Sequence, residues 1–318
     1  MATPVALLSF AFLVAAVCAA IMGYAIQRGA TCMVAAVDEV MTKRRATRLL
    51  GLLEAAVWVA GGVLVWRMIG GQQTLPIGYP TLPITVAGGL LLGLGALVTR
   101  ACVFGAIARF GSGEWAYVLT PVGFFVGCAT IWPLLGMFPP MQMASPVFDA
   151  GWLLVPFAIF VAWRSVEAFR AGRTGKFAAH ISTPHRATMV IGIVFAISLI
   201  AIGPWAYTYA LLSLAQGRTD GVLVKFVLLF MLFAGALTGG WTAGRLKLTA
   251  PTRDAVIRCF AGGVLMGWGS LLIPGGNDEL LLVGIPLLQP YAWVAVASMT
   301  VAIVIGMTVE RRLSRAGP

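Results

Sequence analysis

The sequence predicts an all-α polytopic membrane protein with about nine transmembrane helices. Hydrophobic residues make up 60% of the 318 residues and charged residues only 10%, whereas a soluble domain carries roughly 25% charged residues. So few charged side chains cannot cover a water-soluble core, which excludes a soluble enzyme, and the apolar content excludes a disordered scaffold. Nine spanning helices need about 180 residues, so we expect one integral-membrane domain over residues 1–318.

Long apolar runs give the positions of the predicted spanning helices. In chain order, these are residues 5–24, 49–69, 82–99, 116–138, 147–163, 188–216, 222–244, 255–273 and 291–309. No basic residue precedes the run at 5–24, so we interpret it as the first span and not as a cleaved signal peptide. The segment at 147–163 is short and contains Pro156, which is unfavourable inside a helix.

The net charge of +11 is distributed by loop. Sixteen of the 22 basic residues lie in four clusters, at 43–48, 164–186, 245–258 and 311–315. The intervening loops at 70–80 and 139–150 contain no Lys or Arg. This alternation follows the positive-inside rule and predicts an N-terminus outside and a C-terminus in the cytoplasm. The charge therefore indicates topology and a lipid environment, and no nucleic-acid partner is expected.

Three stretches, at 25–40, 88–114 and 262–284, depart from simple spanning helices. Each begins as a Gly-rich apolar helix, passes through a polar or Gly-rich break, and resumes as an apolar segment too short to cross a bilayer. Irregular backbone at membrane depth occurs where protein or a watery cavity satisfies its polar groups, and such breaks mark substrate sites in transporters. One spacing of nine residues recurs, in the pairs Gly23 and Cys32, Gly93 and Cys102, and Gly267 and Gly276.

At these breaks the sequence resembles the YeeE/YedE family of bacterial inner-membrane sulphur-transport proteins. The segment GYAIQRGATC at 23–32 resembles the family signature GF-x-L-Q-x-x-x-x-C. The segment at 88–105 resembles its GG-x-LxGxG…C-x-x-G signature, and the segment at 262–269 resembles its GG-x-LMGxG block. The resemblance runs through most of the chain, and its second motif is the most specific.

The resemblance implies a membrane transporter, not an enzyme, that brings thiosulfate or a related sulphur anion into the cytoplasm. It implies an inverted-repeat fold in which membrane-dipping half-helices surround a narrow waist, where cysteines pass the substrate along by thiol contacts. It also implies a location in the bacterial inner membrane and a cytoplasmic TusA-like sulfurtransferase as a partner.

Two departures from the family pattern affect the expected cargo. Arg100 and Ala101 stand where the family often has Gly-Gly, and the segment PGGNDE at 274–279 stands where many members have a third cysteine. Gly276 occupies the cysteine-like spacing, so a relay of three thiols at these motifs is excluded. Two alternatives stay open, a transporter of a selenium or other sulphur compound and a membrane sulfurtransferase that uses a persulfide cysteine.

The candidate substrate-path residues lie at the three breaks. They are Cys32, Cys102, Arg28, Arg100, Gly105, Gly275, Gly276 and Asn277. A neutral thiol offers a weak S–H donor and a polarisable sulfur to a soft anion, and half-helix N-termini add N–H groups and a positive dipole end. The remaining cysteines, Cys18, Cys128 and Cys259, are interpreted as packing residues.

The charged and polar residues at the breaks each have two interpretations. Arg28 and Arg100 either attract the anion or anchor the inner face by snorkelling to water. Asn277, Asp278 and Glu279 either line the path or cap a helix that starts near Leu280. Because a carboxylate repels an anion, proton coupling is the more natural role for Asp278 and Glu279 if they take part.

No feature of the sequence predicts a metal or a cofactor. His180 and His185 lie in a basic loop without neighbouring Cys or carboxylate clusters, which makes no persuasive metal site. The chain has no Walker-type phosphate-binding loop, so we expect no ATP-driven step in this chain.

Overall fold

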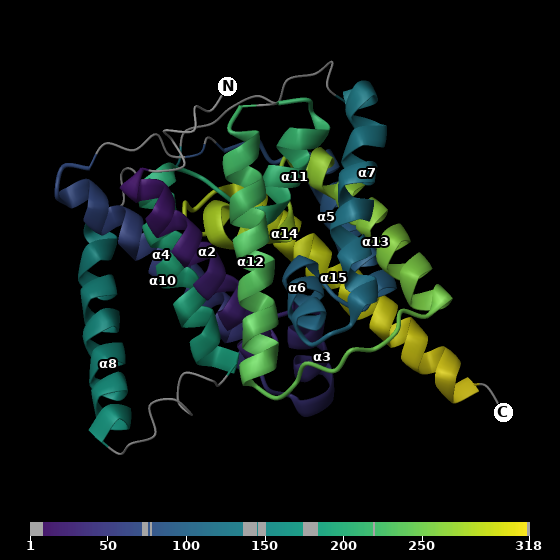
Figure 1. Ribbon diagram of the computed structural model, residues 1–318, viewed down its shortest axis with the longest axis horizontal. Helices are drawn as coiled ribbons and strands as arrows, with labels where there is room; N and C mark the ends of the chain where they lie inside the picture. The colour runs from purple at the N-terminus through teal and green to yellow at the C-terminus, as the bar shows by residue number, and fades with distance from the viewer. Residues whose placement is uncertain are drawn as a thin grey trace.

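The structure, a computed structural model, describes residues 9–71, 76, 78–135, 145, 151–173, 184–218 and 220–316. In these residues it is helical and forms no β-sheet (Figure 1). It contains eight helices long and apolar enough to cross a membrane, or nine if one bent pair counts as a single span. The prediction of an all-α polytopic membrane protein with about nine spans is therefore confirmed. His180 and the start of the predicted span at 147–163 lie outside the described residues.

The helices follow one another along the chain with short connections. They are α2 (Phe10–Gly29), α3 (Met33–Lys43), α4 (Thr47–Met68), α5 (Pro83–Thr99), α6 (Val103–Gly111), η1 (Trp115–Val118), α7 (Leu119–Leu135), η3 (Gly151–Leu153), α8 (Leu154–Arg173), α10 (Pro184–Ile202), α11 (Tyr207–Ala215), α12 (Val222–Thr242), α13 (Arg253–Leu272), α14 (Asn277–Glu279), the π-helical turn η4 (Leu280–Gly284) and α15 (Pro290–Ala316).

A short helix follows a long one at four places. The pairs α2–α3, α5–α6 and α13–α14 correspond to the three breaks predicted from the sequence. The fourth, α10–α11, corrects the expectation of one continuous helix at 188–216, because the chain bends by 45° between these two helices. Gly203 has a φ of 86° and Pro204 follows it. A proline lacks the N–H that continues a helix and disfavours the helical conformation of the residue before it.

Glycines allow the long helices to approach one another closely. A Cβ atom on Gly95 of α5 would lie 2.6 Å from the carbonyl oxygen of Gly262 on α13, and one on Gly269 equally close to that of Gly88. Other helix pairs in contact are α2 with α10 and α12, α4 with α10, α7 with α13, and α5 with α15. Small residues at such contacts are typical of helix packing in lipid, where dispersion and not the hydrophobic effect favours association.

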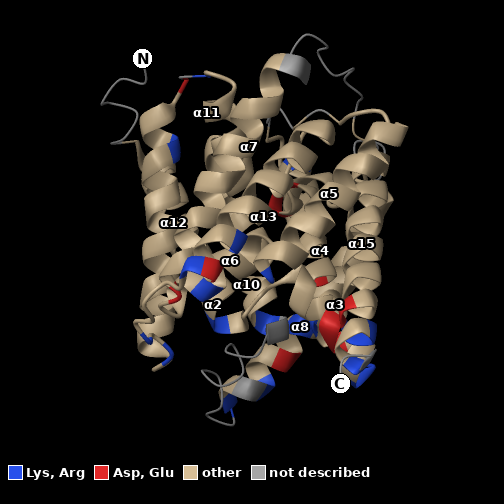
Figure 2. Ribbon diagram, turned by 90° about the vertical axis from the view of Figure 1, so that its right-hand side faces the viewer, with Lys and Arg blue, Asp and Glu red and all other residues tan. Residues whose placement is uncertain are grey.

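The charged residues divide the bundle into two ends. Figure 2 shows that most Lys and Arg residues gather at the end that holds the C-terminus, while the N-terminus lies at the opposite end. We call the first the basic end. Its position is what the positive-inside rule requires of a cytoplasmic face, and the orientation itself stays a prediction.

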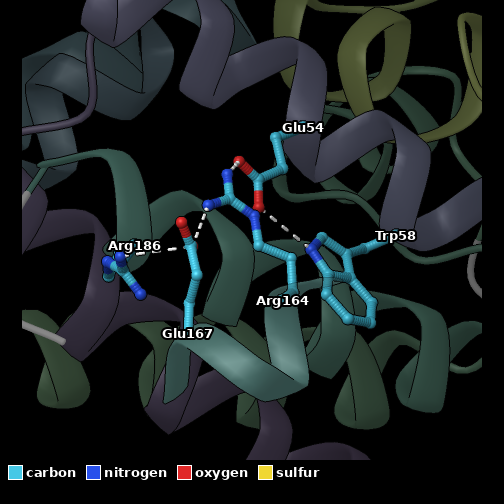
Figure 3. A network of polar contacts seen from close by, with 5 residues as sticks. All are labelled: Glu54, Trp58, Arg164, Glu167 and Arg186. Atoms are coloured by element: carbon cyan, nitrogen blue, oxygen red, sulfur yellow. Dashed lines mark hydrogen bonds and ion pairs between the residues drawn. The ribbon is translucent and has the colours of Figure 1, made fainter. Parts of the chain in front are cut away.

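Helix α8 stands at the edge of the bundle (Figure 1) and is held by a polar network (Figure 3). Arg164 of α8 forms a buried ion pair with Glu54 of α4 and a second ion pair, at 2.6 Å, with Glu167. Glu167 in turn lies 3.4 Å from Arg186 of α10, and the indole N–H of Trp58 donates to Glu54 at 3.4 Å. The network connects three helices, so it fixes α8 against the bundle.

Candidate functional site

The four short helices begin at one place inside the bundle. The backbone N–H of Met33 donates to Sγ of Cys102 at 3.1 Å, which joins the start of α3 to that of α6. The N–H of Val103 donates to Oδ1 of Asn277 at 3.3 Å, joining α6 to α14. The N–H of Thr208 donates to Oδ2 of Asp278 at 3.0 Å, joining α14 to α11. We call the residues Cys32, Cys102, Thr208, Asn277 and Asp278 the central junction.

The short helices leave the central junction in opposite directions. In Figures 1 and 2, α3 and α6 lie toward the basic end, whereas α11 lies toward the end that holds the N-terminus. The positive dipole ends of α3, α6 and α11 therefore meet near the middle of the bundle. Such an arrangement favours negative charge and hydrogen-bond acceptors at the junction.

Cys32 and Cys102 stand side by side at the starts of α3 and α6. Each is the N-cap residue of its short helix, and the two thiols hydrogen-bond to each other. Cys102 is fully buried and Cys32 is 8% exposed. A Cβ atom on Gly105 would lie 2.5 Å from Sγ of Cys32, so the glycine leaves the space that this thiol fills.

A small recess reaches Cys32. Its lining consists of Gly29, Thr31, Cys32, Arg48, Leu52 and Thr188. Arg48 belongs to the basic cluster at 43–48, so the recess lies on the side of the junction that faces the basic end. Oγ1 of Thr31 is buried without a hydrogen-bond partner. The sequence analysis missed Thr31, Arg48 and Thr188, which come from different segments and share no motif.

The third break brings Gly276 and Asn277 to the junction and leaves Gly275 beside it. A Cβ atom on Gly276 would collide with the side chain of Thr208, so the glycine lets α14 and α11 touch. Asn277 is fully buried; its Oδ1 is used by Val103, while its Nδ2 has no hydrogen-bond partner. A Cβ atom on Gly275 would lie 3.1 Å from Oε2 of Glu279.

Asp278 and Thr208 form a contact that the sequence analysis did not foresee. The Asp278 carboxylate accepts hydrogen bonds from both the backbone N–H and the hydroxyl of Thr208. The expectation that Asn277 and Asp278 cap a helix starting near Leu280 is wrong, because that helix already begins at Asn277, with Gly276 as its N-cap. Their side chains reach the starts of α6 and α11 instead. The Gly-Pro pair at 203–204 was the available signal for α11.

The two candidate arginines lie differently from the thiols. Arg100 is the C-cap of α5, and its side chain is 62% exposed and 3.9 Å from Glu310 of α15. The structure thus does not bring Arg100 to the thiols. Arg28 is half-buried and lies over the ring of Tyr24, 5.8 Å from its centroid.

The other cysteines and the histidines contribute nothing to the junction. Cys18, Cys128 and Cys259 are buried and free, and the thiol of Cys128 donates to the carbonyl oxygen of Gly267 at 3.5 Å, within the α7–α13 contact. Among the residues that the structure describes, no group of three or more His, Cys, Asp or Glu side chains is arranged to hold a metal ion.

The arrangement can bind and pass a soft anion. It combines two neutral thiols, the N-termini of α3 and α6, and one buried amide donor that has no partner. A weak sulfur acceptor holds the Met33 N–H, and an anion could take its place at small cost because sulfur is a poor hydrogen-bond acceptor.

Comparison with known proteins adds one match. A family model described as "Sulphur transport" matches residues 28–305 of the chain. This range contains the whole junction and all eight candidate residues. No curated protein matches the sequence significantly.

Proposed function

We propose that this chain, which belongs to the YeeE/YedE sulphur transport family, imports thiosulfate or a related sulphur anion through the central junction. It is a multi-pass membrane protein of a transporter family. The observation that carries the proposal is the contact of Cys102 with the Met33 N–H. It puts a polarisable sulfur on the N-terminus of one short helix at the start of another.

The proposed mechanism exchanges one sulfur acceptor for another. In the structure, Sγ of Cys102 takes the hydrogen bond of the Met33 N–H. The terminal sulfur or an oxygen of the anion would replace it there, while the thiols of Cys32 and Cys102 donate to the anion. Full removal of water from a dianion is costly unless such donors replace it. Weak thiol donors also release the anion again, as transport requires.

The recess beside Cys32 is the proposed exit from the junction. An anion passed from Cys102 to Cys32 would next meet Thr31, Thr188 and Arg48, the residues that line this recess. Arg48 would attract it toward the basic end. By the positive-inside rule this end faces the cytoplasm of the bacterial inner membrane, with the N-terminus outside. A TusA-like sulfurtransferase would receive the sulphur at that face.

We interpret the two halves of the chain as an inverted repeat. In the first half, α2–α3, α4, α5–α6 and α7 follow in order, and α10–α11, α12, α13–α14 and α15 repeat that order. The helix contacts correspond as well, because α2 packs on α12 as α10 packs on α4, and α5 on α15 as α13 on α7. Short helices that enter from both sides toward one site support this interpretation.

One observation favours a second function, that of a membrane sulfurtransferase. Cys102 lies against a second thiol, an arrangement that also suits transfer of a persulfide sulfur between cysteines. Mass spectrometry of the purified protein after thiosulfate exposure separates the two functions, since an added sulfur atom on Cys102 appears only if the chain works by a persulfide.

The experiment that tests the proposal is uptake of ³⁵S-thiosulfate into proteoliposomes that contain the purified protein. Uptake should exceed that of empty liposomes and should be competed by unlabelled thiosulfate. Sulfite and selenite as competitors identify the preferred anion. If protein-containing liposomes accumulate no more label than empty ones with any of these anions, the proposal is wrong.

A further inference from the structure

The protein's own acceptors occupy the donors at three short helix starts. Sγ of Cys102 takes the N–H at the start of α3, and Oδ1 of Asn277 takes the one at the start of α6. The carboxylate of Asp278 takes both donors of Thr208 at the start of α11. A helix N-terminus favours a negative group. Of the three acceptors, Asp278 is the only carboxylate, so the protein itself supplies an acidic group where an anion is to pass.

The surroundings of Asp278 contain no compensating cation. The side chain is 2% exposed, and the titratable groups that face it are Glu279 on its own segment, Tyr207 on α11 and the Cys102 thiol at the start of α6. The adjoining turn η4 is apolar. In the part of the chain that the structure describes, no Lys or Arg forms an ion pair with Asp278 or Glu279. A carboxylate inside a membrane protein without a cation is costly and is a functional suspect by default.

Two buried polar atoms next to Asp278 have unused hydrogen-bonding capacity. Nδ2 of Asn277 is a buried donor without a partner, and Oε2 of Glu279 is a buried acceptor without one. Asn277 itself is fully buried between Val103 and Asp278. The junction thus keeps a donor ready for an anion and an acceptor ready for a proton within three consecutive residues.

Glu279 faces the end of the bundle opposite to the basic end. Tyr79, which precedes α5, stacks edge to face on Tyr291 at the start of α15, with ring centroids 5.3 Å apart. Burial and, second, the charge of Glu279 raise the pKa of Tyr79 to about 12. Glu279 therefore lies between Asp278 and the loop that contains Tyr79, on the side where we expect substrate and protons to enter.

We propose that Asp278 is a proton-coupling site, and that at least one proton crosses the membrane with each imported anion; this inference rests on the proposed function. A proton from the outside, passed by Glu279, binds the Asp278 carboxylate and forms one O–H bond, with no change of oxidation state. The neutral acid holds Thr208 less tightly, since it no longer balances the dipole of α11. The donors of Thr208 and Asn277 then become available to the anion. Release of the anion toward the recess lets the proton leave to the cytoplasm and restores the carboxylate contact.

The test measures anion accumulation against a pH gradient. Proteoliposomes with the membrane potential clamped receive ³⁵S-thiosulfate, and a pH dye inside reports proton entry. With one proton per anion, an outside pH one unit below the inside pH should raise steady-state accumulation in wild type about tenfold, and the dye should report acidification during uptake.

Two Asp→Asn variants assign the site. Asp278→Asn keeps an acceptor for the Thr208 N–H and cannot bind the proton; accumulation should lose its dependence on the gradient, whatever its rate. Asp254→Asn alters a 76% exposed carboxylate that pairs with Arg258 and should respond like wild type. A full gradient response in Asp278→Asn would overturn the role of Asp278.

The wild-type measurement decides the coupling even if Asp278→Asn fails to fold. Wild-type uptake that ignores the gradient and leaves the dye unchanged would overturn the inference and leave the proposed function standing. Absence of any wild-type uptake would refute the proposed function, and the inference with it.

Discussion

The sulfur of Cys102 accepts a hydrogen bond from the backbone N–H of Met33 at 3.1 Å, although the two residues are 69 positions apart in the sequence. The contact joins the starts of α3 and α6 and keeps Cys102 against Cys32. It also means that the donor most exposed to the positive end of α3 is held by a weak acceptor. Thiol chemistry and helix-dipole electrostatics therefore act at the same point.

Gly105 tests whether the space beside Cys32 matters. The Cβ atom of Gly105→Ala would lie 2.5 Å from Sγ of Cys32 and 3.1 Å from Cβ of Ala101, and such overpacking costs about 1–3 kcal/mol. We expect thiosulfate uptake to fall several-fold at equal protein amount. Gly172→Ala, in α8 with no atom within 4 Å of the added Cβ, is the control and should transport like wild type. Normal uptake in Gly105→Ala would show that the thiol can move aside freely.

Gly276 tests the contact between α14 and α11. A methyl group there would collide with Thr208, which must shift away from Asp278. We expect Gly276→Ala to lower both the midpoint of thermal unfolding and uptake, measured in detergent and in proteoliposomes. Gly151→Ala, where the added Cβ meets nothing within 4 Å, should change neither. An unaltered Gly276→Ala protein would mean that α11 can move without loss.

The buried ion pair of Glu54 and Arg164 should stabilise the attachment of α8. Both side chains are less than 10% exposed, so Glu54→Leu leaves a buried arginine with one partner fewer and should cost about 3–5 kcal/mol of stability. Replacing both residues, as Glu54→Leu with Arg164→Met, should recover most of that loss.

Thermal unfolding of the single and double variants checks this expectation. The exposed pair of Arg100 and Glu310 serves as a comparison, since Glu310→Gln should change stability by about 0–1 kcal/mol. If Glu54→Leu is as stable as Glu310→Gln, the network of Figure 3 does not hold α8.

Cysteine labelling at the two ends of α8 tests the orientation. Gly151 and Gly172 have open space around them, and all five native cysteines are buried, so only the introduced thiols should react quickly. An impermeant maleimide should label Gly151→Cys in intact cells and Gly172→Cys only after lysis, because Gly172 adjoins a basic cluster. Labelling of Gly172→Cys in intact cells would reverse the orientation.

The sequence was sufficient to predict the fold class and three of the four helix breaks, because glycines and polar residues interrupt apolar runs at 25–40, 88–114 and 262–284. The fourth break, before α11, went unnoticed because its segment is apolar apart from one Gly-Pro pair. Hydropathy alone does not separate a bent span from a straight one.

The contacts of the junction depended on tertiary structure. The shared spacing before Cys32 and Cys102 suggested equivalent positions, and the structure brings them together. Whether Arg100 points to the thiols or to Glu310 is decided by the packing of α5 on α15, which no local pattern reveals. The role of Asp278 at the start of α11 was hidden for the same reason, since its partner Thr208 lies 70 residues away.

Uptake of ³⁵S-thiosulfate by Cys102→Ala tests the thiol path most directly. The substitution removes the sulfur but keeps a small apolar side chain, so the protein should still fold. Uptake should fall far more than in Cys18→Ala or Cys128→Ala, whose thiols lie away from the junction. Cys102→Ser, which keeps a donor and loses the polarisable sulfur, should fail nearly as badly if softness matters and recover in part if donation suffices. Wild-type uptake by Cys102→Ala at matched protein amount would contradict passage of the anion by thiol contact.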